Sequence, residues 1–239
     1  MEHADTATRQ RVGEPIHETA LTLLAQRRAD EILPPGPGRS LYVLLEPELG
    51  RGRPDIILMA VSSAALSAFT RASLRLPTLT AARALDLTVA DSDLGVTDKY
   101  ARQLRRELSL NGWNLSRATR RTLVGDSIAL EAKIRDWSRA VRQAAMYADW
   151  CHRSALLMPS RAAKRVPSSA LDFYGLGLLD AENSRVSWEA PAPKRHLRPA
   201  VQFWLIELLI RGLENGTAYR FSSSAKPLSA SRNTSTRDA

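Results

Sequence analysis

The chain has 239 residues, of which 44% are hydrophobic and 25% are charged, so it can bury the core of one domain or of two small ones. Lysine and arginine outnumber aspartate and glutamate by 34 to 25, and the formal net charge of +9 favours an anionic partner such as nucleic acid. A single cysteine, Cys151, excludes an intramolecular disulfide and a cysteine-rich zinc site, and it fits a reducing compartment.

The beginning of the chain, MEHADTATRQ, is acidic and polar, which is not typical of a signal peptide. The longest apolar run, FWLIELLI, is short and contains Glu207. A membrane span needs about 20 apolar residues, so we expect no contact with a membrane and a cytoplasmic location.

Hydrophobic periodicity predicts an α/β fold. A helix is predicted at residues 16–33, where the apolar spacing is helical and ends before PPGPG. Strands are predicted at 40–46 and 53–61, joined as a hairpin through the turn-forming PELGRG. A further strand, a helix and a strand are predicted at residues 127–134, 136–150 and 154–159.

Two more strands are predicted from DFYGLGLLDA and RVSWEA, on either side of a Glu-Asn-Ser turn, followed by a basic, proline-rich linker and a helix at 199–214. Helical periodicity dominates residues 62–125, so this segment looks inserted. We therefore predict a core of residues 14–61 and 126–216, the insert at 62–125, and a disordered Ser/Thr-rich tail at 222–239.

The triplet Glu131-Ala132-Lys133 lies in the strand predicted at 127–134. Because side chains alternate along a strand, Glu131 and Lys133 should face one side and the apolar neighbours Leu130, Ala132 and Ile134 the other. The chain has only five lysines, although chance still supplies about half an acid-x-Lys triplet in a chain of this composition. A surface ion pair is the alternative interpretation.

Pro54-Asp55 lies near the start of the strand predicted at 53–61. If that strand pairs with the one that carries Glu131, two carboxylates and a lysine share one site. Hard divalent cations prefer such oxygen ligands, so the set indicates a Mg²⁺ site, with Mn²⁺ as the alternative ion. Lys133 would orient a water or stabilise negative charge in the transition state.

Gln143 and Tyr147 are four residues apart on the helix predicted at 136–150, so they share a face from which both could reach a substrate. The alternative is that Tyr147 belongs to the core and Gln143 is a solvated helix residue.

In this order, the motifs resemble those of the PD-(D/E)XK nuclease superfamily: PD at Pro54-Asp55, E-x-K at Glu131 and Lys133, and Q-x-x-x-Y at Gln143 and Tyr147. The last motif is similar to that of the helicase-associated exonuclease branch. The resemblance covers residues 16–60 and 127–160. It implies a restriction-endonuclease-like fold, a mixed sheet flanked by helices, whose core order of helix, three strands, helix and strand matches the predicted one.

The resemblance also implies roles for single residues. Asp55 and Glu131 would bind the metal, the carbonyl of Ala132 would complete its shell, and Lys133 would assist hydrolysis. Glu18 would be an extra acid on the first helix, where an exposed helical acid is an equally good interpretation.

The long separation of Asp55 from Glu131 departs from the compact members of that superfamily, in which only a hairpin lies between these strands. Asp126 is the nearer candidate, but it is too close to Glu131 for a turn and a separate paired strand. We therefore keep Asp55 and attribute the separation to the insert.

Within the insert, TDKYARQLRRELSLNGW has an apolar stripe and a basic face, and it precedes a basic segment with strand character. The pattern resembles a winged helix-turn-helix, whose last helix usually enters the major groove of DNA. A solvated helical subdomain and a dimerisation surface are the alternatives. The expected DNA contacts are Lys99, Arg102, Gln103, Arg105 and Arg106 on the helix and Arg117, Arg120 and Arg121 on the wing.

The sequence thus predicts a Mg²⁺-dependent nuclease that hydrolyses phosphodiester bonds, with DNA favoured over RNA as substrate and the insert positioning it. Cutting both strands with one site per chain would favour a homodimer. The alternative is a DNA-binding regulator in which the nuclease-like core is catalytically silent and the winged helix recognises the DNA.

Overall fold

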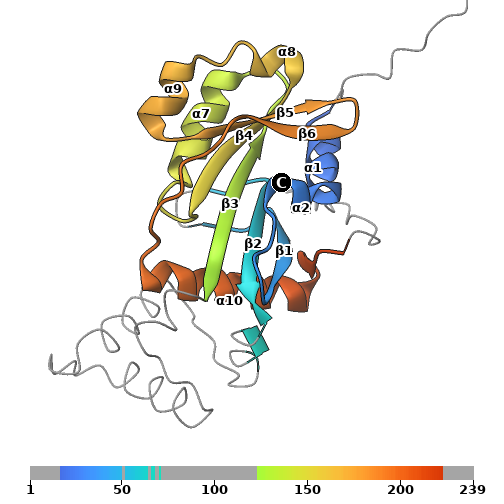
Figure 1. Ribbon diagram of the computed structural model, residues 1–239, viewed down its shortest axis with the longest axis vertical. Coiled ribbons are helices and arrows are strands. Elements are labelled where there is room, and N and C mark those ends of the chain that lie inside the picture. Colours follow the sequence, from blue (N-terminus) through green and yellow to red (C-terminus); the bar gives the residue numbers. More distant parts are fainter. Residues whose placement is uncertain (1–16, 50–51, 64–65, 68–69, 71–122, 223–239) are drawn as a thin grey trace, which may run out of the picture.

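The computed structural model describes residues 17–49, 52–63, 66–67, 70 and 123–222 (Figure 1). Most of the predicted insert and of the predicted tail lies outside these residues. In chain order the described elements are α1 (Glu18–Arg27), α2 (Ala29–Ile32), β1 (Arg39–Leu45), β2 (Ile56–Ser62), β3 (Val124–Ala132), α7 (Trp137–Met146), β4 (Arg153–Pro159), α8 (Ser160–Ala163), α9 (Ser168–Tyr174), β5 (Gly177–Glu182), β6 (Arg185–Ala190), α10 (Pro199–Asn215) and β7 (Ala218–Arg220).

The strands form one mixed, seven-stranded sheet in the order β6-β5-β4-β3-β2-β1-β7. β1, β2 and β3 are antiparallel neighbours, whereas β3, β4 and β5 run parallel. The predicted hairpin is confirmed, because β1 and β2 pair in register from Arg39–Ser62 to Leu45–Ile56. The predicted α/β class with a mixed sheet flanked by helices is confirmed as well.

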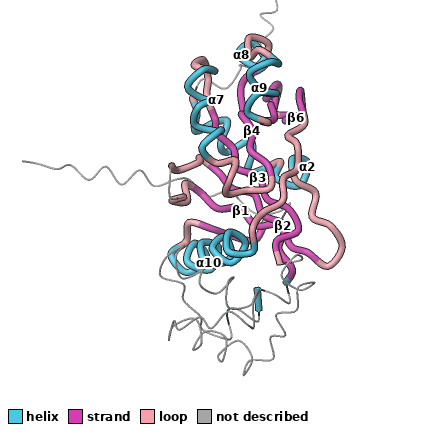
Figure 2. The backbone as a smooth tube through the Cα atoms, turned by 90° about the vertical axis from the view of Figure 1, so that its left-hand side faces the viewer, coloured by secondary structure: helices cyan, strands magenta, loops and turns pink. Residues whose placement is uncertain are grey.

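Helices cover both faces of the sheet, because alternate side chains of the central strands point to opposite sides. On one face, Leu21 and Ala25 of α1 pack with Leu58 and Leu130 of the sheet. On the other face, α10 packs against β1 and β2 at one end of the sheet, while α7 and α9 pack against β4 and β5 at the other. Figures 1 and 2 show α10 crossing the lower part of the sheet and α7 to α9 gathered above it.

Several boundaries differ from the prediction. The helix predicted at 16–33 is two helices, because Arg28 leaves helical geometry with φ −112° and ψ 23°. β3 begins at Val124, inside the segment assigned to the insert, because its pairing with β2 continues past an irregularity at Ala60/Val61. β7 lies beyond the predicted core and adds an edge strand beside β1. None of the described helices is both long enough and apolar enough to cross a membrane.

Candidate active site

The pairing of β2 with β3 brings Asp55 and Glu131 to the same place in the sheet. The register of the pair ends with Ile56 opposite Leu130, so the next step places Asp55 opposite Glu131. β2 and β3 pair with each other although a long segment separates them in the sequence. The pairing on which the predicted site depends is therefore present.

Asp55 lies just before β2 and is partly buried. Its Oδ2 accepts a hydrogen bond of 2.7 Å from the backbone N–H of Ala132. Burial raises the pKa of Asp55, against the lowering effects of this hydrogen bond and of the Lys133 charge. The carboxyl group is thus fixed against the end of β3 in a place that disfavours its negative charge.

Glu131 is almost fully buried, with 2% of its surface exposed. Its Oε1 lies 3.0 Å from the ammonium of Lys133, and its Oε2 accepts a hydrogen bond of 3.1 Å from the hydroxyl of Tyr147. Burial, followed by the neighbouring charge of Asp55, raises the pKa of Glu131, while Lys133 and Tyr147 lower it. The charge of Asp55 thus adds to the cost of ionising Glu131 in this site.

The sequence predicts Lys133 within the strand. In the structure it follows Ala132, the last residue of β3. Its backbone N–H still donates to the carbonyl of Leu157 in the neighbouring β4. The ammonium contacts Glu131 and donates to the carbonyl of Ala132 at 3.0 Å and to Glu18 at 3.3 Å. Burial alone would lower the pKa of Lys133, but Glu131, Asp55 and Glu18 together raise it, so the lysine is a cation at neutral pH.

Tyr147 caps the C-terminus of α7 and belongs to both the core and the site. The ring is 1% exposed, and its hydroxyl reaches Glu131. Burial and the charges of Glu131 and Asp55 raise the pKa of the phenol, so Tyr147 keeps its proton and donates a hydrogen bond to the carboxylate. The sequence leaves open whether Tyr147 is a core residue or a site residue. Tyr147 packs in the core and also contacts Glu131.

Among the described residues, two other candidates form no hydrogen bond or ion pair with this cluster. Gln143 is half-buried on α7, and its Oε1 is buried with no hydrogen-bond partner among the described residues. Asp126 lies near the start of β3, where it pairs with Arg153 at 3.2 Å and Lys194 at 3.3 Å. We set Asp126 aside as too close in sequence to Glu131 to lie on a separate paired strand. The structure places both residues on β3, with Asp126 toward the opposite end.

The oxygen atoms around Asp55 and Glu131 fit a divalent cation. Two carboxyl groups whose ionisation is disfavoured by burial gain from a nearby positive charge, and the carbonyl of Ala132 is a further oxygen donor. Among the described residues, no group of three or more His, Cys, Asp or Glu side chains is arranged to hold a metal ion. A cation would therefore need water or substrate oxygens to complete its shell.

The predicted DNA contacts Lys99, Arg102, Gln103, Arg105, Arg106, Arg117, Arg120 and Arg121 lie outside the described residues. Sequence reasoning missed a second cluster of polar residues, which joins His152 to the linker before α10. Its visible signal was the basic run Lys194-Arg195-His196. The buried Ser127, which holds the ring of His152, had no signal in the sequence.

Comparisons with known proteins assign no family to the chain. No protein-family model matches the chain, and no curated protein matches it. Among solved structures, the chain is similar to the SPO1766 protein of unknown function from Silicibacter pomeroyi, with 22% sequence identity and a TM-score of 0.32. The similarity covers 38% of this chain and 60% of that one, and it carries no argument about fold or function.

Proposed function

We propose that the chain is a metal-dependent nuclease of the PD-(D/E)XK type, with a restriction-endonuclease-like core and a winged-helix insert, and that it hydrolyses phosphodiester bonds in DNA. One observation carries the proposal: Asp55, Glu131 and Lys133 meet at adjacent strand ends although a long segment separates them in the sequence. A chance acid-x-Lys triplet would have no reason to meet the Pro-Asp of another strand.

The chemistry of the site suits hydrolysis of a phosphodiester. Asp55, Glu131 and the carbonyl of Ala132 would hold Mg²⁺ or Mn²⁺. The bound ion supplies a Lewis acid that offsets charge on the scissile phosphate and lowers the pKa of a water. Lys133 is a cation, so it donates a hydrogen bond to a phosphate oxygen as negative charge develops there.

The remaining residues position these groups. Tyr147 fixes the Oε2 side of Glu131, and Glu18 holds the lysine from α1. Water attacks phosphorus and loses a proton as the new bond forms, the bond from phosphorus to the leaving oxygen breaks, and that oxygen takes up a proton, so the number of protons balances.

Cleavage assays test the proposal. Purified protein with Mg²⁺ or Mn²⁺ should cut single- or double-stranded DNA, and chelation by EDTA should stop it. Glu131→Gln and Lys133→Ala should each reduce the rate by about 10² to 10³, the usual effect of removing one group that stabilises the transition state. Glu31→Gln, on the exposed ion pair with Arg28, and Lys164→Ala, at an exposed lysine, are matched controls that should cut normally.

Two results would contradict the proposal. One is the absence of cleavage of every form of DNA and RNA with either metal. The other is cleavage that survives Glu131→Gln and Lys133→Ala. Cleavage of RNA alone would support phosphodiester hydrolysis, with RNA in place of DNA as the substrate. DNA binding without cleavage would favour the catalytically silent regulator.

A further inference from the structure

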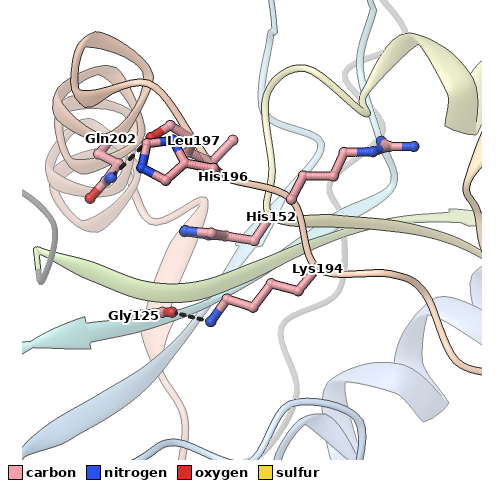
Figure 3. A pocket seen from close by; sticks show the side chains of 7 residues that line it. Gly125, His152, Lys194, His196, Leu197 and Gln202 are labelled. Carbon is pink, nitrogen blue, oxygen red and sulfur yellow. Dashed lines mark hydrogen bonds between the residues drawn. The ribbon is translucent and has the colours of Figure 1, made fainter.

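A cavity of about 360 Å³ lies at the other end of β3 from Glu131. It is formed where β3 and β4 begin and where the linker before α10 passes them (Figure 3). Gly125 and Glu131 are six steps apart along β3, which is roughly 20 Å. The two sites therefore share no residue. The lining residues are Gly125, His152, Lys194, Arg195, His196, Leu197 and Gln202.

Positive charge exceeds negative charge around the cavity. The ammonium of Lys194 donates to the carbonyl of Gly125 at 2.7 Å and pairs with Asp126 at 3.3 Å. Arg153 pairs with the same carboxylate at 3.2 Å. Asp126 is thus shared by two cations, and the exposed ring of His196 adds a third basic group nearby. In Figure 3, His152 and the extended side chain of Lys194 lie side by side beneath His196 and Gln202.

His152 is held rigidly in the wall of the cavity. Its backbone N–H donates to Oγ of Ser127 at 3.1 Å, and its Nδ1 lies 3.0 Å from the same oxygen. Burial lowers the pKa of His152 to about 4; Asp126 opposes this, while Lys194, His196 and Arg153 lower the pKa further. The ring is therefore neutral, and an anion bound among these groups would favour its protonation.

Gln202 lines the cavity from α10. The side chain is 3% exposed, and its Nε2 donates to the carbonyl of Leu197 at 3.3 Å. Its Oε1 is buried and has no hydrogen-bond partner among the described residues. Because this oxygen has almost no accessible surface, Gln202 and Leu197 form a packed wall of the cavity, against which the uncharged part of a ligand can lie.

We propose that this cavity binds a phosphate group carried on a sugar, as in a free nucleotide or the terminal nucleotide of a strand. The phosphate oxygens accept from Lys194 and from the imidazole groups, and the sugar lies against the wall formed by Leu197 and Gln202. The volume lies at the lower end of small-molecule pockets and exceeds what a single ion needs. Because the site is separate from Glu131, the proposal does not depend on nuclease activity.

Calorimetric titration of the whole protein tests the inference with inorganic phosphate, AMP and a 5′-phosphorylated oligonucleotide as probes. AMP should bind more tightly than phosphate. Lys194→Ala and His196→Ala should each weaken AMP binding about tenfold, the usual effect of losing a hydrogen bond to a charged group. Lys164→Ala is the matched control and should leave binding unchanged. Glu131→Gln should also leave it unchanged, which separates this site from the proposed catalytic one.

The outcomes distinguish the sources of the phosphate. Tighter binding of AMP than of the oligonucleotide assigns the site to a free nucleotide, and the reverse order assigns it to a strand end. No binding of any probe overturns the inference, as does binding that Lys194→Ala and His196→Ala leave intact. NMR titration of His152 adds a second readout: its pKa should rise when AMP is bound, and an unchanged pKa contradicts the proposed contacts.

Discussion

Burial disfavours the charged form of the Asp55 carboxyl group. The ionised group therefore lowers the stability of the folded protein. Between the ordinary pKa of an aspartate and the raised pKa in the folded protein, the folded state binds more protons than the unfolded state. Stability from this group is therefore present at low pH and is lost as pH rises through that window. A carboxylate held under this penalty is typical of a site kept for function rather than for stability.

Asp55→Asn should therefore raise the melting temperature at pH 8 in the presence of EDTA. Asparagine can still accept the hydrogen bond from Ala132, but it carries no charge to bury. The gain should shrink toward pH 4, where the wild-type carboxyl group becomes protonated. Thermal unfolding from pH 4 to pH 8 measures this gain in melting temperature. Asp30→Asn, at an exposed residue of α2, is the control. A difference from wild type that does not change with pH would contradict this account.

Tyr147→Phe should change how the cleavage rate depends on pH. The hydroxyl of Tyr147 lowers the pKa of Glu131, so its removal raises that pKa and moves the acid limb of the rate profile to higher pH. The rate at neutral pH should fall about tenfold, which corresponds to one hydrogen bond to a charged group. Tyr219→Phe removes a comparable hydroxyl that donates to Gln26, away from the site. An acid limb that stays in place in Tyr147→Phe would show that the tyrosine is only a core residue.

The connection between β1 and β2 supports the site from outside the strands. Gly52 lies so close to Tyr147 that a Cβ at this position would be 2.9 Å from Cε1 of the ring. This is shorter than a normal contact between carbon atoms, so Gly52→Ala should displace the ring and loosen its hydrogen bond to Glu131. We expect a lower cleavage rate. Gly36→Ala is the matched control, because nothing lies within 4 Å of a Cβ there. Equal rates in the two variants would mean that the connection does not support the site.

Residue alternation predicted the face of Glu131 correctly, because Leu130 and Ala132 need the apolar core on the other side. Alternation could not predict that β3 begins at Val124, since Gly125 and Asp126 have weak strand propensity and the strand is continued by the pairing of Asp126 and Val124 with β2. The contacts of Lys133 with Glu18 and of Tyr147 with Glu131 join separate helices to the strand. Such contacts depend on tertiary packing, which periodicity does not contain.

One core cluster connects the parts of the molecule that hold the site. α10 contributes Phe203 and Leu209 to the same apolar cluster as Ile57 of β2 and Tyr147. The sheet, the helix beneath it and the phenol that reaches Glu131 therefore share one packed interior. Loss of packing at α10 should lower the stability of the site and of the sheet together, as in a two-state transition.

Leu209→Ala tests this link, because Leu209 has no exposed surface. Removal of a buried leucine side chain costs about 2 to 5 kcal/mol, since both the buried area and the packing are lost. Leu213→Ala on the same helix removes a side chain that is 39% exposed, and it should change stability by about 0.5 kcal/mol or less. Urea unfolding followed by circular dichroism measures both variants. In Leu209→Ala, cleavage should be lost at the same urea concentration as the secondary structure. Loss of cleavage well before the sheet unfolds would show that the site is a separate, weaker unit.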